Sequence, residues 1–327
     1  MFPKNCLLAA VDLGSNSFRL EVDQYKAGYL RRKIYLREPI RLGRGLDENM
    51  LLSPQAMTRG WDYLEKLGEH IKNYKVYKTR AIATQTLRQA KNRQEFVQKG
   101  QELLGHPIEI ISGEQEALLI YTGVTALLDT KFMRRGMTNT EKRLVIDIGG
   151  RSTEIITGQG LSAHTPTSTA IGSVSLSIQF FSDGALTKTQ FDHAIAYAQS
   201  HFSEALQTLK NHRTELPAWD KAYGASGTIG AIGNVLRRNH ITNGTITQSG
   251  LDWIYAQLLK AGHIDRLQLA GLGERKDVIG GGLSSLMALF SIIPNLQNVS
   301  PTRGALRQGI LYDMIKSSST HFPKSSY

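Results

Sequence analysis

The stretch "LVIDIGGRSTEIIT", Leu144 to Thr157, is typical of an apolar strand, an aspartate, a glycine turn and a second strand. The stretch "AAVDLGSNSFRLEV", Ala9 to Val22, has the same order of residue types. Asp12 and Asp147 then align at an offset of 147 − 12 = 135 residues. The repeat predicts two β-hairpins of one kind, carried by two similar α/β domains.

The residue types of these hairpins suit a phosphate group. Glycines let the backbone approach a ligand closely, consecutive turn N–H groups form an anion-binding concavity, and hydroxyls add donors. An aspartate beside a phosphate repels it unless a cation lies between them, so Asp12 and Asp147 indicate Mg²⁺. The predicted phosphate-binding residues of the two turns are Ser15, Asn16, Ser17, Gly149, Gly150, Arg151, Ser152 and Thr153.

The composition narrows the class of partner. A chain of 327 residues favours two domains. Its 39 Lys and Arg against 28 Asp and Glu give a net charge of +11, which favours a polyanionic partner such as a phosphate-rich small molecule. A basic solvated surface is the alternative. The charge occurs in scattered pairs and no nucleic-acid-binding motif is recognisable, so we expect no nucleic acid partner.

The sequence also bears on the compartment. A single cysteine, Cys6, excludes an internal disulfide framework and suits a reducing compartment. The apolar run "CLLAAV" near the N-terminus is shorter than a secretory signal. The uncharged run from Val278 to Thr302 is interrupted by Gly, Ser, Asn and Pro, which predicts a buried helix and a loop. We therefore expect a cytoplasmic protein that does not contact a membrane.

An arginine in "TRAIATQTLRQAKN" indicates anion binding. The pattern predicts a strand from Thr79 to Thr84 that turns into a helix, with Arg88 in the first turns. An arginine near a helix N-terminus opposes the helix dipole, so its presence favours a bound anion. A surface arginine is the alternative.

The stretch "YGASGTIGAIGNVL", Tyr223 to Leu236, predicts a strand end, a small-residue loop and a helix start, which can cradle a phosphate or a nucleotide. It matches neither the P-loop motif nor the dinucleotide fingerprint. A tight strand-to-helix turn without a ligand is the alternative. The candidate binding residues are Ser226, Gly227 and Thr228.

Two further stretches carry acidic residues that bear on the chemistry. Glu154 lies on the returning strand of the second hairpin, where an inward carboxylate would bind metal or position water; a solvated strand face is the alternative. The stretch "SGEQEALLIYTGV" predicts a helix with Glu114 and Glu116 in its first turn, where the dipole favours carboxylates.

The paired hairpins are followed in order by "ATQTLRQAKN", "IEIISGEQEALLIYTGV", "AYGASGTIGAI" and "GALRQGILYD". This series resembles the exopolyphosphatase/guanosine pentaphosphatase (Ppx/GppA) family, in the actin/Hsp70/sugar-kinase superfamily, over nearly the whole chain. The resemblance implies two ribonuclease-H-like (actin-like ATPase) domains with an interdomain cleft. It also implies that Glu116 is the general base, that Arg88 contacts the phosphate chain, and that Asp147 and Glu154 lie around the metal.

The resemblance sets the expected domains. We expect a first domain at 1–125, completed by a C-terminal helix at about 304–316, and a second domain at 126–303. Residues 317–327 are expected to form a disordered tail. The chain thus resembles the short, two-domain form of the family.

Three positions depart from the family pattern. Arg151 replaces the third glycine of the turn, and Arg303 and Gln308 replace an Asp and a Glu. If the turn needs a positive φ at this position, arginine costs about 1 to 2 kcal/mol and distorts the loop. If it does not, as Asn16 at the matching place indicates, Arg151 adds a charged grip on phosphate.

The leading functional hypothesis is a Mg²⁺-dependent exopolyphosphatase, which removes terminal phosphate from inorganic polyphosphate. Guanosine pentaphosphate is the alternative substrate. A weakly active polyphosphate or nucleotide sensor is the alternative of another class, and an ATP-dependent kinase comes third. Another divalent metal and an added monovalent cation stay open, and we expect a homodimer.

Overall fold

The computed structural model describes residues 2–3, 5–26, 29–133, 139–210 and 216–318. Its internal contacts divide the chain into two compact units, residues 1–126 with 306–327, and residues 127–305. The boundary falls within one long helix, α4 (Gly113–Met133). Of the expected disordered tail at 317–327, residues 317 and 318 belong instead to helix α10 (Leu306–Ser318), and the rest lies outside the described residues.

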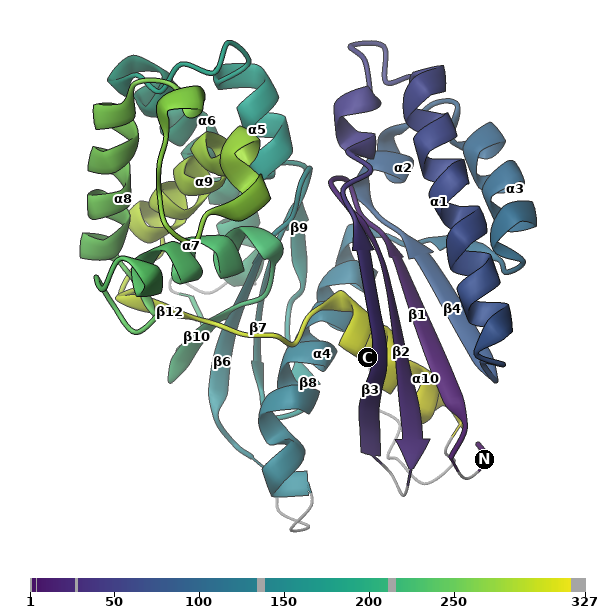
Figure 1. Cartoon of the computed structure of the whole chain (residues 1–327). Coiled ribbons are helices and arrows are strands. Elements are labelled where there is room, and N and C mark those ends of the chain that lie inside the picture. Colours follow the sequence, from purple (N-terminus) through teal and green to yellow (C-terminus); the bar gives the residue numbers. More distant parts are fainter. Residues whose placement is uncertain (1, 4, 27–28, 134–138, 211–215, 319–327) are drawn as a thin grey trace. The chain divides into compact units, whose positions relative to one another are not determined.

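The first unit is built on a five-stranded sheet with the order β3-β2-β1-β4-β5 (Figure 1). Its strands are β1 (Leu7–Leu13), β2 (Phe18–Lys26), β3 (Tyr29–Glu38), β4 (Lys78–Ala83) and β5 (Ile108–Ile110). Its other elements are a 3₁₀ helix (Leu42–Gly45), α1 (Pro54–Asn73), α2 (Gln85–Gln89), α3 (Arg93–Leu104), the first part of α4, and α10 (Leu306–Ser318).

The second unit has a sheet with the order β11-β12-β10-β6-β7-β8, in which β9 also pairs with β7. Its strands are β6 (Lys142–Ile148), β7 (Thr153–Gln159), β8 (Ser162–Ala163), β9 (Thr167–Thr169), β10 (Lys221–Gly224), β11 (Ile246–Thr247) and β12 (Asn298–Pro301). Its helices are α5 (Ser173–Phe180), α6 (Lys188–Lys210), α7 (Gly227–Arg238), α8 (Gln248–Ala261) and α9 (Ile279–Ile292), with 3₁₀ helices at Ile264–Arg266 and Gly273–Val278.

The two sheets share one topology. In each, the first two strands form an antiparallel hairpin, and the first strand continues into a parallel row, β1-β4-β5 in one unit and β6-β10-β12 in the other. The hairpin registers also match, because Asp12 lies opposite Arg19 and Asp147 lies opposite Glu154. Each residue of the second pair is 135 positions after its counterpart in the first. The prediction of two ribonuclease-H-like α/β units is confirmed, whereas the interdomain cleft stays a prediction.

Burial follows from strand position. The central strands β1 and β6 are buried along almost their whole length, as expected for strands covered on both faces. The neighbouring β2 alternates, with Phe18, Leu20 and Val22 in the core against helices α1 and α3. Its intervening residues Arg19 and Glu21 therefore lie on the opposite face of the sheet, beside the contacts with α10.

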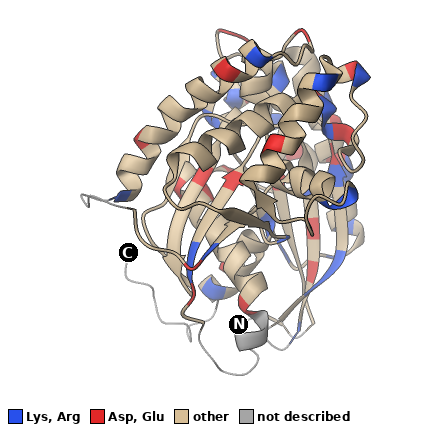
Figure 2. Cartoon of the chain, turned by 90° about the vertical axis from the view of Figure 1, so that its left-hand side faces the viewer, with Lys and Arg blue, Asp and Glu red and all other residues tan. Residues whose placement is uncertain are grey.

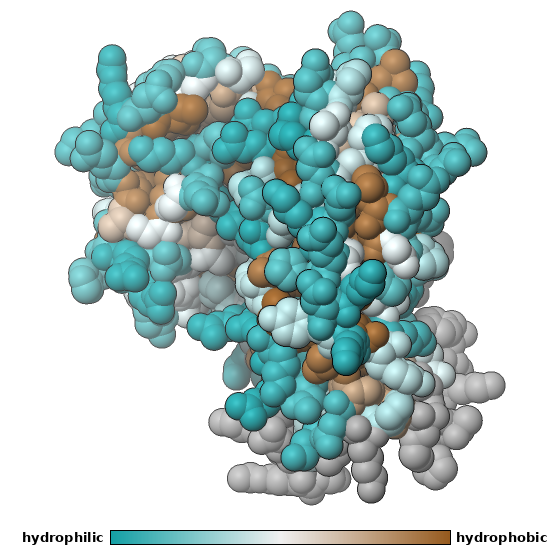
Figure 3. All heavy atoms as spheres, turned by 45° about the vertical axis from the view of Figure 1, so that its right-hand side comes forward, coloured by the Kyte–Doolittle hydropathy of each residue, from teal (hydrophilic) through white to brown (hydrophobic). Residues whose placement is uncertain are grey.

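The predicted buried helix in the uncharged run is α9, which packs against α5 and α6. None of the helices in the described part of the chain combines the length and the apolar composition needed to cross a membrane. In Figure 2 the basic and acidic residues are interspersed over helices and strands. The face shown in Figure 3 is mostly hydrophilic, with apolar residues in small groups.

Helix α10 packs closely against α4 of the same unit at Gly309. A Cβ there would overlap the backbone carbonyl of Leu119. Gly309→Ala should therefore lower the free energy of unfolding by about 2–3 kcal/mol, seen as a fall in Tm of about 4–10 °C. Gly230→Ala is the control, because a Cβ there would meet no described atom within 4 Å outside its own helix turn. It should be neutral or stabilise α7 by up to about 1 kcal/mol. Equal Tm values for the two variants would contradict this packing.

Candidate functional site

The turn of the first hairpin is fixed by backbone hydrogen bonds. The N–H of Arg41 donates to the carbonyl of Asn16 at 2.9 Å, and the N–H of Gly43 donates to the carbonyl of Ser15 at 2.7 Å. A Cβ on Gly14 would lie 3.1 Å from the carbonyl oxygen of Ser17, so only glycine fits easily. The orientation of the predicted phosphate-binding turn is therefore set by the 3₁₀ segment that follows β3.

Two arginines that the sequence reasoning missed reach this hairpin. Nη1 of Arg19 lies 3.0 Å from Oδ2 of the buried Asp12, and Nε of Arg37 donates to Oγ of Ser17 at 3.3 Å. The 135-residue offset was a usable signal for Arg19, because it takes the place that Glu154 has in the second hairpin. Because Asp12 already forms an ion pair with a guanidinium, a metal ion would have to share this carboxylate with Arg19.

The structure brings Arg88 and Glu116 together. Nη1 of Arg88 donates to Oε2 of the buried Glu116 at 2.8 Å and to the carbonyl of Ile111 at 2.9 Å. Nε of Arg88 donates to Gln85. Its Nη2 is buried without a hydrogen-bond partner among the described residues. A buried guanidinium N–H without an acceptor is costly, so this group suits an anion that the chain does not supply.

The helix predicted after Thr84 is present but short. Helix α2 ends at Gln89, so Arg88 lies in the last turn of a five-residue helix. The helix dipole therefore does not oppose this arginine. The chain leaves the helix at Ala90, whose backbone is extended, and α3 begins only at Arg93. The prediction that Arg88 binds phosphate therefore depends on its unpaired N–H. The position of Arg88 relative to the helix dipole no longer supports it.

The second hairpin turn is held by the N-terminus of α5. The N–H of Ser173 donates to the carbonyl of Gly149 at 3.0 Å, and the N–H of Val174 donates to that of Gly150 at 2.7 Å. A Cβ on Gly172 would lie 2.6 Å from the carbonyl carbon of Gly150, so the two backbones touch. As in the first hairpin, the turn carbonyls are bound by a following segment.

The backbone conformation at Arg151 shows whether this turn requires a glycine. Neither Arg151 nor Asn16 has a positive φ. The alternative in which arginine strains a glycine turn is therefore wrong. Arg151 is half-buried, and burial lowers the pKa of its guanidinium from the ordinary value. An anionic partner acts in the opposite direction, since it favours the charged form.

Asp147 and Glu154 form a pair of carboxylates. They lie directly opposite each other across the antiparallel β6–β7 ladder, and both side chains are buried. Oε1 of Glu154 also accepts a hydrogen bond from Ser168 at 2.8 Å. Like charges opposite one another destabilise a sheet. Two hard oxygen donors of this kind suit Mg²⁺, which binds one or two carboxylates and takes its other ligands from water and substrate phosphates.

The structure gives less support to three of the predicted donors. The hydroxyl of Thr153 donates to the carbonyl of Ile171 at 2.7 Å, and that of Thr228 donates to Ser173 at 3.2 Å. Oγ of Ser226 accepts from the N–H of Ile229 and so caps α7. These hydroxyls hold the local structure, and their phosphate-binding roles stay predictions.

Gly227 has a neighbour that the sequence did not reveal. A Cβ on Gly227 would overlap the guanidinium of Arg275, which comes from the 3₁₀ helix before α9. This arginine therefore lies at the N-terminus of α7. In the sequence Arg275 was visible only as one half of a basic pair. Within the described residues, no group of three or more His, Cys, Asp or Glu side chains is arranged to hold a metal ion.

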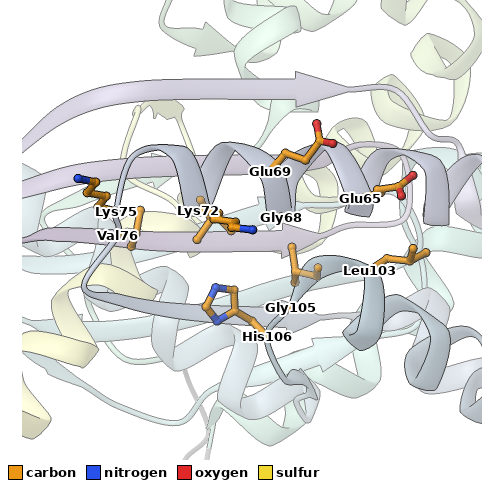
Figure 4. A pocket seen from close by; sticks show the side chains of 11 residues that line it. Glu65, Gly68, Glu69, Lys72, Lys75, Val76, Leu103, Gly105 and His106 are labelled. Carbon is orange, nitrogen blue, oxygen red and sulfur yellow. The ribbon is translucent and has the colours of Figure 1, made fainter.

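A groove of about 510 Å³ lies between α1 and α3 in the first unit. Figure 4 shows Lys72, Lys75 and His106 toward one end and Glu65 toward the other. Burial lowers the pKa of His106, which favours its neutral form. The residues that line the groove include none of the predicted site residues. Because both charge signs are present, the groove does not have the character of a phosphate site.

Comparison with known proteins decides the family. The model of the Ppx/GppA phosphatase family matches residues 22–318. The chain belongs to this family. It is 38% identical over 311 residues to a guanosine-5'-triphosphate,3'-diphosphate pyrophosphatase of Vibrio cholerae. The aligned region covers 95% of this chain and 59% of that relative. The chain thus spans 59% of the length of the curated relatives it matches.

Solved structures show the same fold. An exopolyphosphatase from Cytophaga hutchinsonii has a TM-score of 0.82 at 20% identity, covering 95% of this chain and 98% of that chain. A PPX-GPPA enzyme of Aquifex aeolicus has a TM-score of 0.72 at 23% identity, with 94% and 99% covered. Phosphatases of the family depend in general on a divalent cation.

The buried Asp23 on β2 gives a testable pH dependence. Burial first, and the carboxylate of Glu21 second, raise the pKa of Asp23 to about 7, while Arg32 and Arg307 act in the opposite direction. Its Oδ1 has no hydrogen-bond partner in the described structure. Between the unfolded value near 4 and about 7, the folded state binds more protons than the unfolded state, so stability falls as pH rises.

Asp23→Asn should remove this loss. We expect the variant to melt about 3–6 °C above the natural chain at pH 8 and at the same temperature at pH 4. Thermal unfolding across this pH range measures the difference. The exposed Asp62→Asn is the control and should shift neither end of the curve. A constant difference between Asp23→Asn and the natural chain at all pH values would contradict the assignment.

Proposed function

We propose that this chain is a divalent-cation-dependent phosphohydrolase that cleaves terminal phosphoanhydride bonds. The observation that carries the proposal is the ion pair of Arg88 with Glu116. It places a carboxylate beside a guanidinium whose Nη2 is buried without a hydrogen-bond acceptor among the described residues. An anion on Arg88 would bring its phosphorus close to a water molecule held by Glu116. This arrangement matches the roles expected for the two residues.

Guanosine pentaphosphate is the substrate we now place first. The curated relatives at 37–38% identity carry that activity in their names, whereas the exopolyphosphatase of Cytophaga hutchinsonii supports only the fold. Inorganic polyphosphate stays the second candidate, favoured by the net charge of +11. We further propose a cytoplasmic protein, with Mg²⁺ as the metal and a homodimer as the assembly.

In the proposed reaction Glu116 accepts a proton from water as the oxygen attacks the terminal phosphorus. The bond to the bridging oxygen breaks, and the shortened substrate leaves with that oxygen. Arg88 binds the transferred phosphate, and the two hairpin turns with Arg151 bind the phosphate chain. Asp147 and Glu154 would hold the cation, with Asp12 a weaker candidate because it already faces Arg19. When bound, the cation would supply positive charge where negative charge develops on the transferred phosphate and the leaving oxygen.

The sensor hypothesis has lost part of its basis. It depended on Arg151, Arg303 and Gln308 as departures from the family pattern. Arg151 causes no backbone strain, and Gln308 donates from Nε2 to Glu21 at 2.6 Å, which gives it a structural reason to be neutral. Release of phosphate from guanosine pentaphosphate and from polyphosphate, each with Mg²⁺ and with EDTA, tests the proposed function. No release from either substrate with Mg²⁺ would support the sensor.

Glu116→Gln separates catalysis from binding. The amide keeps the size and polarity of the side chain but does not accept the proton, so kcat should fall at least about 100-fold while substrate Kd changes only a few-fold. Glu114→Gln is the matched control, because Glu114 is exposed on the same helix turn. It should retain activity within about 3-fold. Equal losses in both variants would remove Glu116 from the mechanism.

Arg151→Gly tests the charged grip on the phosphate chain. Because the turn does not need glycine at this position, the variant should bind long polyphosphate more weakly, with a flatter dependence on salt, and should not gain Tm. Binding titrations at several salt concentrations measure both effects. Arg238→Ala, an exposed arginine at the end of α7, is the control. Tighter binding by Arg151→Gly would contradict the role.

A further inference from the structure

A buried charge network in the first unit joins residues from both ends of the chain. Asp12 and Glu21 are only 3% and 2% exposed. Nη1 of Arg307, on α10, lies 3.5 Å from Oδ2 of Asp12, and its Nε donates to Oε2 of Glu21 at 3.1 Å. Arg19 approaches the same Oδ2 of Asp12 from β2. A residue near the C-terminus thus contacts the strand end that precedes the first hairpin turn.

The contacts of Asp12 and Glu21 are with guanidiniums and an amide. Two carboxylates face two guanidiniums, and the second contact from α10 to Glu21 comes from the neutral Gln308. A carboxylate at position 308 would face Glu21 directly. Buried charges are stable only when they are paired and hydrogen-bonded. Loss of Arg307 would therefore leave Asp12 with a single cation and Glu21 with only an amide.

We propose that Arg307 is a positioning residue for Asp12, and through it for the phosphate-binding turn of the first hairpin. The inference rests on the proposed function. Asp12 lies two residues before Gly14, on the same strand end as the turn. Arg307 is itself fixed from several sides, since its guanidinium carbon lies 5.0 Å from the ring centre of Tyr35 in addition to its two carboxylate partners.

A second ion pair on α10 provides the matched control. Nη1 of Arg80, on β4, lies 2.7 Å from Oδ2 of Asp313 and so also ties α10 to the sheet. It does not contact Asp12. If Arg307 only docks the helix, Arg307→Met and Arg80→Met should affect activity alike. If Arg307 positions Asp12, Arg307→Met should lower kcat about 10- to 100-fold with KM changed less than about 3-fold, and Arg80→Met should keep kcat within about 2-fold.

Arg307→Lys keeps the positive charge but does not reach both carboxylates with a planar fork. It should recover at least about 5-fold in kcat relative to Arg307→Met. A double-mutant cycle with Asp12→Asn gives the sharpest test. If Arg307 acts through Asp12, adding Arg307→Met to Asp12→Asn should lower kcat by less than about 3-fold. If Arg307→Met lowers kcat by the same factor in the natural chain and in Asp12→Asn, the proposal is overturned.

A binding measurement tests the role of Arg307 independently of turnover. The cycle is repeated on the Kd of tripolyphosphate, measured by calorimetry, in all four proteins. If the natural chain hydrolyses neither substrate but binds tripolyphosphate, the proposed function fails, and the binding cycle alone decides the role of Arg307. Equal fold-losses of affinity in both backgrounds overturn it. If the natural chain neither releases phosphate from either substrate nor binds tripolyphosphate, both proposals are overturned.

Discussion

The rest of the molecule depends on how tightly the two hairpins turn. At Gly14 and at Gly149, an added Cβ would approach a carbonyl three residues later to 3.1 and 3.0 Å. This close approach fixes the register of each antiparallel pair, so that an aspartate is always opposite the residue seven positions further on. The register then decides which charges share one face of the sheet.

The two hairpins use the same register for opposite charge chemistry. In the first, the residue opposite the aspartate is Arg19, and the carboxylate is neutralised by the protein itself. In the second it is Glu154, and two carboxylates lie together. One duplicated element therefore carries an acid–base pair in one unit and a pair of carboxylates, the cation ligands proposed above, in the other. This difference in charge between the two hairpins resides in one matching position, Arg19 in the first and Glu154 in the second.

The sequence predicted the elements with local signals well. The repeat, the two hairpins, the acidic first turn of α4 and the loop before α7 follow from neighbouring residues, whose pattern and turn chemistry are readable in one stretch. The contacts of Arg307 with Asp12 and of Arg275 with Gly227 were not predictable, because no local pattern couples residues so far apart in the chain. The helix after Thr84 was predicted, but its early end at Gln89 was not, because the sequence there lacks a glycine or proline stop signal.

The assignment of α10 to the first unit has a consequence for synthesis on the ribosome. The second unit is one continuous segment, so its sheet has all its strands before residue 306 emerges. The first unit is complete only after helix α10 is made, because Arg307 and Glu21 are 286 positions apart. Until then, Asp12 and Glu21 lack a cation that the finished fold supplies, and their hydration opposes burial. Of the two units, the one whose strands come first in the sequence is thus completed later.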